Sequence, residues 1–113
     1  MLTDAVLRAA KQLGLTNRVL AGVLGLSEAT VSRMRAGDYE LQRGQKPFEL
    51  AALLVRLHRS LCAIAGGDRT VASAWLQSPN YALHDRPLSL IQTIAGLVNV
   101  IEYLEARSAV GRR

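Results

Sequence analysis

Residues 17–36 read N-R-V-L-A-G-V-L-G-L-S-E-A-T-V-S-R-M-R-A, and this stretch decides how the rest of the chain is interpreted. Ala21 is a small residue at a position where two helices can cross closely, and Val31 lies where the second helix packs back on the first. Gly25 stands between them, where a left-handed backbone turn costs glycine little. Ser27 can cap the second helix by accepting a backbone N–H. This order of residue types predicts a helix-turn-helix, with a plain helical hairpin as the alternative.

Apolar residues recur at helical spacing along the rest of the chain, and few stretches alternate in the manner of a strand. The pair at 66–67 is Gly-Gly and marks an internal boundary, while Thr16, Asp68 and Thr93 are residue types that cap helix starts. The predicted fold class is therefore all-α, with a helix-turn-helix domain at 1–65 and a smaller helical domain at 66–113. The predicted helices span residues 4–13, 17–24, 27–36, 47–65, 68–76, a short segment starting at 85–87, and 93–107.

Two of these predicted helices are apolar over wide arcs. At 47–65, polar side chains such as Glu49 and Arg56 share one narrow arc, so this helix should be central to the fold. At 93–107 the apolar arc is wider than the stripe of a one-sided helix, so one face should meet the core and another a subunit or partner. The tail after Arg107, S-A-V-G-R-R, has no helical pattern and should be short, mobile and cationic.

The charge of the chain is concentrated around the helix-turn-helix pattern. The 113 residues are 50% hydrophobic and can form one ordinary domain or two small ones. The net charge is +5 and the pI about 10.1. Residues 1–65 carry nine Lys/Arg and five Asp/Glu, a net charge of +4, whereas residues 66–113 carry five and four, a net charge of +1. This distribution suits contact with DNA, although a solvated basic face has the same composition.

Cysteine usage and hydropathy indicate the compartment. Cys62 is the only cysteine, so no disulfide can form within the chain, which suits a reducing environment. There is no run of about 20 apolar residues that would span a membrane. The N-terminus M-L-T-D-A-V lacks the basic start and apolar block of a secretory signal. We expect a cytoplasmic protein with no membrane partner.

Catalytic chemistry finds little support in the sequence. His58 and Cys62 are four residues apart on one predicted helix, a spacing that can hold a metal, but no second pair completes a site. There is no glycine-rich phosphate loop, no Cys-x-x-Cys and no clustered pair of carboxylates. Trp75, the only tryptophan, fits a core position, with a hot spot for a partner as the alternative. The sequence therefore predicts no enzyme activity, no catalytic residue, no metal and no cofactor.

The helix-turn-helix pattern itself predicts DNA-contacting residues. The second helix of this motif lies in the major groove, with its first turns nearest the bases. Arg33 can make a bidentate contact with guanine, and Glu28 can accept from cytosine N4. A homodimer would contact two half-sites about 34 Å apart, because one such unit makes too few base contacts. The predicted DNA-binding residues are Asn17, Arg18, Ser27, Glu28, Ala29, Ser32, Arg33 and Arg35.

The second half reads A-W-L-Q-S-P-N-Y-A-L at 74–83, R-P-L-S-L-I at 86–91 and T-I-A-G-L-V-N-V-I-E-Y-L at 93–104. This ordered set resembles the toxin-binding domain of Xre/MbcA/ParS antitoxins, a family that also carries an Xre-like helix-turn-helix in front. Two positions depart from the family pattern. His84-Asp85 stands where many members have a glycine, and Ile94-Ala95 where many have acidic residues. The matching residues are Trp75-Leu76, Pro79-Asn80, Ala82-Leu83, Pro87-Leu88, Thr93 and Gly96.

The resemblance implies a type II antitoxin that is not an enzyme, forms homodimers and represses its own operon by binding operator DNA. The usual partner is a RES-domain toxin that consumes NAD, and the C-terminal part of the antitoxin covers or enters the active-site cleft of the toxin. By position, the predicted toxin-binding residues are Val100, Tyr103, Leu104, Arg107, Arg112 and Arg113.

Besides a small enzyme, which the lack of catalytic motifs disfavours, two alternatives to this function stay open at the level of sequence. One is a phage-type helix-turn-helix repressor whose second half only dimerises and which has no toxin partner. The other is an antitoxin whose DNA-binding half is vestigial.

Overall fold

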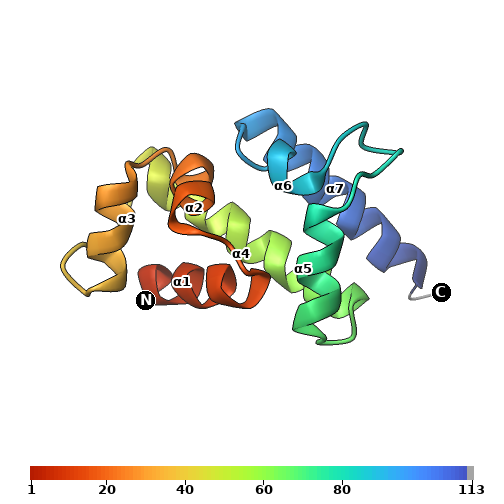
Figure 1. Cartoon of the computed structure of the whole chain (residues 1–113), viewed down its shortest axis with the longest axis horizontal. Coiled ribbons are helices and arrows are strands. Elements are labelled where there is room, and N and C mark those ends of the chain that lie inside the picture. Colours follow the sequence, from red (N-terminus) through yellow and green to blue (C-terminus); the bar gives the residue numbers. More distant parts are fainter. Residues whose placement is uncertain (112–113) are drawn as a thin grey trace.

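The computed structural model describes residues 1–111, and it confirms the predicted all-α fold class. Within these residues there are seven helices, and the only β pairing is an isolated bridge between Asn80 and Asp85. In the same range, no helix is both long enough and apolar enough to cross a membrane. The helices are α1 (Leu2–Leu13), α2 (Asn17–Leu24), α3 (Glu28–Arg35), α4 (Lys46–Ile64), α5 (Arg69–Gln77), α6 (Pro87–Leu90) and α7 (Ile94–Gly111) (Figure 1).

Local capping explains where the helices of the predicted helix-turn-helix begin and end. The Oγ1 atom of Thr16 accepts the N–H of Val19 at 3.1 Å and starts α2. Gly25 then ends α2 with φ of 69°, in the left-handed region that favours glycine. The Oγ atom of Ser27 accepts the N–H of Thr30 at 3.1 Å and starts α3. The predicted turn and both predicted caps are confirmed.

Helix α4 is the centre of the fold, as its wide apolar arc predicted. It packs against α1, α2, α5 and α7, and Figure 1 shows it crossing the molecule diagonally from the α3 side to the α5 side. Leu54 and Leu57 are fully buried on it, and Leu61 is 1% exposed. Buried residues from both halves of the chain form one continuous cluster around this helix. The two halves therefore share a single core.

The last helix starts at an unusually close approach of two backbones. The N–H of Gly96 donates to the Oγ1 atom of Thr93 at 3.1 Å, which confirms Thr93 as the cap of α7. A Cβ atom at Gly96 would lie 2.0 Å from the carbonyl oxygen of Leu90, at the end of α6. No side chain fits in that space, which gives a physical reason for the glycine in the Thr-x-x-Gly pattern.

Two further glycines let the two halves of the chain pack closely. A Cβ atom at Gly14, at the end of α1, would lie 3.0 Å from the Oγ atom of Ser73 on α5. A Cβ atom at Gly22, on α2, would lie 2.7 Å from the Oε1 atom of Gln92, in the turn before α7. The helix-turn-helix thus contacts the second half directly, in addition to the contacts that both make with α4.

The expectation of a tail without helix after Arg107 is wrong for residues 108–111, because α7 continues to Gly111. Once a helix exists, each further residue adds a hydrogen bond without a new nucleation cost. Residues 108–110 are Ser-Ala-Val, with no glycine or proline to end the helix. Arg112 and Arg113, two of the predicted toxin contacts, lie outside the described residues.

Candidate nucleic-acid interface and partner surface

Helix α3 keeps one face on the core and leaves the rest open. Only Val31 and Met34 are buried on it, with 0% and 2% exposure. The positions on α3 that are predicted to face the bases are all exposed, as a helix that enters the major groove requires. These exposed residues are Glu28, Ala29, Ser32 and Arg33.

The Arg33 side chain is held in place by two neighbours that the sequence analysis did not select. Its Nη2 atom donates to the Oγ1 atom of Thr30 at 3.2 Å, and its guanidinium lies 6.0 Å from the ring centroid of Tyr39. Thr30 also shares a 2.9 Å hydrogen bond with Ser27, the cap of α3. The spacing of three residues between Thr30 and Arg33 could have indicated the first contact. Tyr39 lies in the following loop, and no local pattern indicates the second.

Two of the other predicted DNA-binding residues, Asn17 and Arg35, contact each other. The Nε atom of Arg35 donates to the Oδ1 atom of Asn17, which links the last turn of α3 to the first turn of α2. Arg18 is exposed beside Asn17. The structure thus gathers all eight predicted DNA-binding residues on α2, on α3 and at the cap of α3, and Asn17 and Arg35 also link the two helices.

The predicted toxin-binding residues on α7 divide into two groups. Val100 is fully buried and Leu104 is 1% exposed, because α4 packs along the apolar arc of α7. In this conformation neither can contact a partner directly, so the expectation that they do is corrected to a role in the core. Tyr103 is half-buried and Arg107 is exposed, and these two residues remain at the surface.

Tyr103 and Arg107 belong to a stacked column of side chains. The rings of Trp75 and Tyr103 are stacked, with centroids 6.2 Å apart and an interplanar angle of 19°. The guanidinium of Arg107 lies 5.3 Å from the Tyr103 centroid, and its Nη1 atom donates to the Tyr103 hydroxyl at 3.0 Å. Trp75 packs against the core from α5, as the core interpretation predicted. The column therefore connects the core to an exposed cation on α7.

Two family models match successive segments of the chain, and the division between them falls within α4. The model of the antitoxin Xre-like helix-turn-helix domain matches residues 1–56, and that of the antitoxin Xre/MbcA/ParS C-terminal toxin-binding domain matches residues 60–109. The chain belongs to the Xre/MbcA/ParS antitoxin family. No curated protein matches the sequence. The two matched segments meet inside α4, the helix that both halves of this antitoxin use as their core.

An ion pair joins α4 to α7 in this antitoxin. The Nε and Nη2 atoms of Arg56 each donate to a carboxylate oxygen of Glu105 at 2.6 Å. The hydrogen bond and the positive charge of Arg56 hold the pKa of Glu105 below its ordinary value, and Glu105 raises the pKa of Arg56. Both side chains are well exposed to solvent, so the pair orients α7 more than it stabilises the fold.

The His58 and Cys62 pair is only partly buried on α4. Burial lowers the pKa of His58, and the neighbouring charge of Arg59 lowers it further. Among the residues that the structure describes, no three His, Cys, Asp or Glu side chains lie close enough together to hold a metal ion. His58 and Cys62 therefore have no third metal ligand beside them in the described part of the antitoxin.

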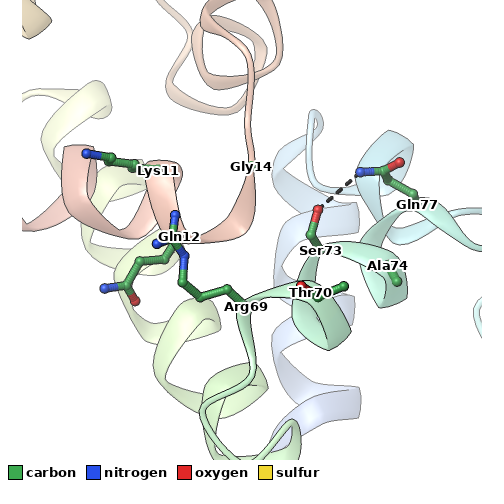
Figure 2. Close-up of a pocket in the computed structure, with 8 residues that line it drawn as sticks. All are labelled: Lys11, Gln12, Gly14, Arg69, Thr70, Ser73, Ala74 and Gln77. Atoms are coloured by element: carbon green, nitrogen blue, oxygen red, sulfur yellow. Dashed lines mark hydrogen bonds between the residues drawn. The ribbon is translucent and has the colours of Figure 1, made fainter.

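A groove of about 580 Å³ lies between the end of α1 and α5 (Figure 2). Lys11 and Arg69 place positive charges on its two sides, and no carboxylate lines it. Figure 2 shows Arg69 reaching from α5 toward Gln12 on α1. Gly14 and Ser73, which form one of the close contacts between the two halves, also line it. The groove thus marks the seam between the halves, and it brings together segments too distant in sequence for a local pattern to predict.

Proposed function

We propose that this antitoxin represses its own operon as a homodimer and neutralises a RES-domain, NAD-consuming toxin by covering its active site. One observation carries this proposal. The molecule is 43 Å along its longest axis, with α3 near one end and the C-terminal part of α7 near the other (Figure 1). One chain can therefore hold DNA and a protein partner at the same time, while α4 connects the two surfaces.

The exposed face of α3 supports the DNA part of the proposal. Arg33 is positioned by Thr30 and Tyr39, so less side-chain freedom is lost when it bonds a guanine. The bidentate geometry of a guanidinium on guanine is the commonest specific contact in the major groove. Asn17 and Arg18, at the start of α2, would contact phosphates. A homodimer would present two such faces to half-sites about 34 Å apart.

The exposed end of the column supports the toxin part. Arginine and tyrosine are enriched among residues that dominate binding energy at protein interfaces, and Tyr103 and Arg107 offer both types side by side. Arg112 and Arg113 follow along the chain and add two more charges. Val100 and Leu104 support this surface from inside the core.

Titration of the DNA upstream of the antitoxin gene tests the first part. Arg33→Ala should weaken specific binding by about 1–3 kcal/mol, because one bidentate base contact is lost. Arg69→Ala, which removes the same charge from α5, is the matched control and should weaken binding far less. A wild-type chain that shows no preference for this DNA would exclude repression and favour a vestigial helix-turn-helix.

Co-purification with the product of the adjacent gene tests the second part. The wild-type chain should form a stable complex and prevent the loss of NAD that the free toxin causes. Arg107→Ala should weaken both effects without unfolding the chain, because Arg107 is exposed. If no complex forms while DNA binding is intact, the protein is the repressor without a toxin partner.

A further inference from the structure

The loop between α5 and α6 carries an aromatic side chain that the rest of the chain does not cover. Tyr81 is 99% exposed, whereas the other aromatic residues of the sequence are all partly buried. Figure 1 shows this loop (teal) projecting from the body of the molecule beside α7. Tyrosine is one of the residue types enriched among those that dominate binding energy at protein interfaces.

The backbone of this loop is held in one conformation. The N–H of Asn80 donates to the carbonyl oxygen of Asp85 at 3.2 Å and closes its base. The N–H of Leu83 donates to the Oδ1 atom of Asn80 at 3.2 Å, and the N–H of His84 donates to the carbonyl oxygen of Tyr81 at 3.3 Å. A loop already ordered in this way loses little conformational entropy when a partner binds it.

His84 adds a second unusual feature to the loop. Its φ is 69°, and among the described residues it is the only one other than glycine with a positive φ. The backbone of a residue other than glycine is strained at such a φ, and backbone strain of this kind is often found at binding sites. Glycine would adopt this φ without strain, so the exchange of this histidine for glycine can separate the role of the imidazole from the shape of the loop.

Two hollows flank the loop, and one of them connects it to α7. Leu83, His84, Glu102 and Tyr103 line a groove of about 440 Å³ between the loop and α7. His84 and Tyr81 line a second hollow of about 370 Å³ on the other side of the loop. The loop therefore forms one continuous surface with Tyr103, which lies between Trp75 and Arg107 in the stacked column. The charge of Glu102 helps to raise the pKa of Arg56, but no ion pair or hydrogen bond with a described side chain holds its carboxylate, which lines this groove.

We propose that residues 79–86 form a second docking element for the toxin. This inference rests on the proposed function. Tyr81 inserts into an apolar recess of the toxin, and a basic side chain of the toxin enters the groove to meet Glu102. His84 lies on the ridge between the two hollows and contacts the same partner. The continuity of the groove with Tyr103 and its position inside the segment matched by the toxin-binding model favour the toxin over other proteins.

Affinity measurements on the complex with the adjacent gene product test this docking element. Tyr81→Ala should weaken binding at least tenfold, and Tyr81→Phe should weaken it less than threefold. Glu102→Gln should weaken binding and make it less sensitive to salt. Val71→Ala, which shortens another exposed apolar side chain on α5, is the matched control and should change the affinity less than twofold.

His84→Gly separates a binding role from a structural one. The substitution relieves the strained φ, so it should raise the thermal unfolding midpoint while weakening toxin binding. A higher midpoint with unchanged affinity would show that the imidazole contacts nothing.

The outcomes distinguish this inference from the proposed function. If Tyr81→Ala and Glu102→Gln bind like the wild type while Arg107→Ala does not, the docking element is wrong and the antitoxin function stands. If the wild-type chain forms no complex at all, both proposals are overturned.

Discussion

Helices α3 and α7 differ in how much of their surface the chain itself uses. α3 buries Val31 and Met34 and leaves every other side chain at least partly open. α7 has apolar residues over a wide arc, and α4 and the neighbouring helices cover most of them. On a helix with few apolar residues, the positions available to a partner can be identified from spacing alone. On a helix that is apolar on several sides, only the packing decides which of them a partner can contact.

The largest expected effect concerns the start of α7. Gly96→Ala should destabilise the chain by about 3 kcal/mol, because its Cβ would overlap the backbone carbonyl of Leu90, which cannot move aside. The free energy of unfolding in urea measures this. Gly22→Ala on α2 is the matched control, since its Cβ meets only the mobile end of Gln92 and alanine favours a helix, so the change should stay within about 1 kcal/mol. Equal effects at the two glycines would refute the close approach at Gly96.

Removing the N-terminal caps of α3 and α7 compares these two helices, with a smaller expected loss of stability. Ser27→Ala and Thr93→Ala should each cost about 1 kcal/mol, because each leaves a helix N–H without its acceptor. α3 keeps Glu28 in its first turn, whereas α7 has no acidic residue there to favour the positive end of its dipole. We therefore expect the larger loss for Thr93→Ala in urea denaturation. The opposite order would mean that α7 depends on its packing rather than on its cap.

The pH dependence of stability tests α4, which both regions share. Burial and Arg59 hold the pKa of His58 below its ordinary value of 6.5, so the unfolded chain binds a proton more readily than the folded one. The contribution of His58 is complete above pH 6.5 and is lost as the pH falls below it. The free energy of unfolding should decline over this interval in the wild type and less steeply in His58→Gln. Parallel curves for the two proteins would contradict the shift.

The smallest effect belongs to the ion pair between α4 and α7. Arg56 lowers the pKa of Glu105 below its ordinary value of 4.5, so the pair contributes above that pH and loses its contribution as the pH falls further. Thermal unfolding from pH 5 to pH 3 should show a slightly weaker acid dependence in Glu105→Gln. High salt should reduce the difference between the two proteins, because the pair is exposed. A difference that high salt leaves intact would place the pair in a less exposed environment.

Prediction from sequence succeeded where one structural feature depends on a few adjacent residues. The caps at Thr16, Ser27 and Thr93 and the turn at Gly25 follow from hydrogen bonds and backbone angles within about four residues. The central position of α4 followed from the width of its apolar arc. The continuation of α7 beyond Arg107 could not be predicted in this way, because a short run without strong apolar periodicity can still extend an existing helix.

The amino-acid sequence by itself determined the all-α class, the helix boundaries set by caps, the exposed face of α3 and the family. Each depends on residue type and local spacing, which a helix converts directly into geometry. Only the tertiary structure decided that Val100 and Leu104 are buried, that Trp75 supports Tyr103, and that Tyr81 stands free beside α7. These facts depend on which distant segments meet, because burial is a property of packing between helices and not of any one of them.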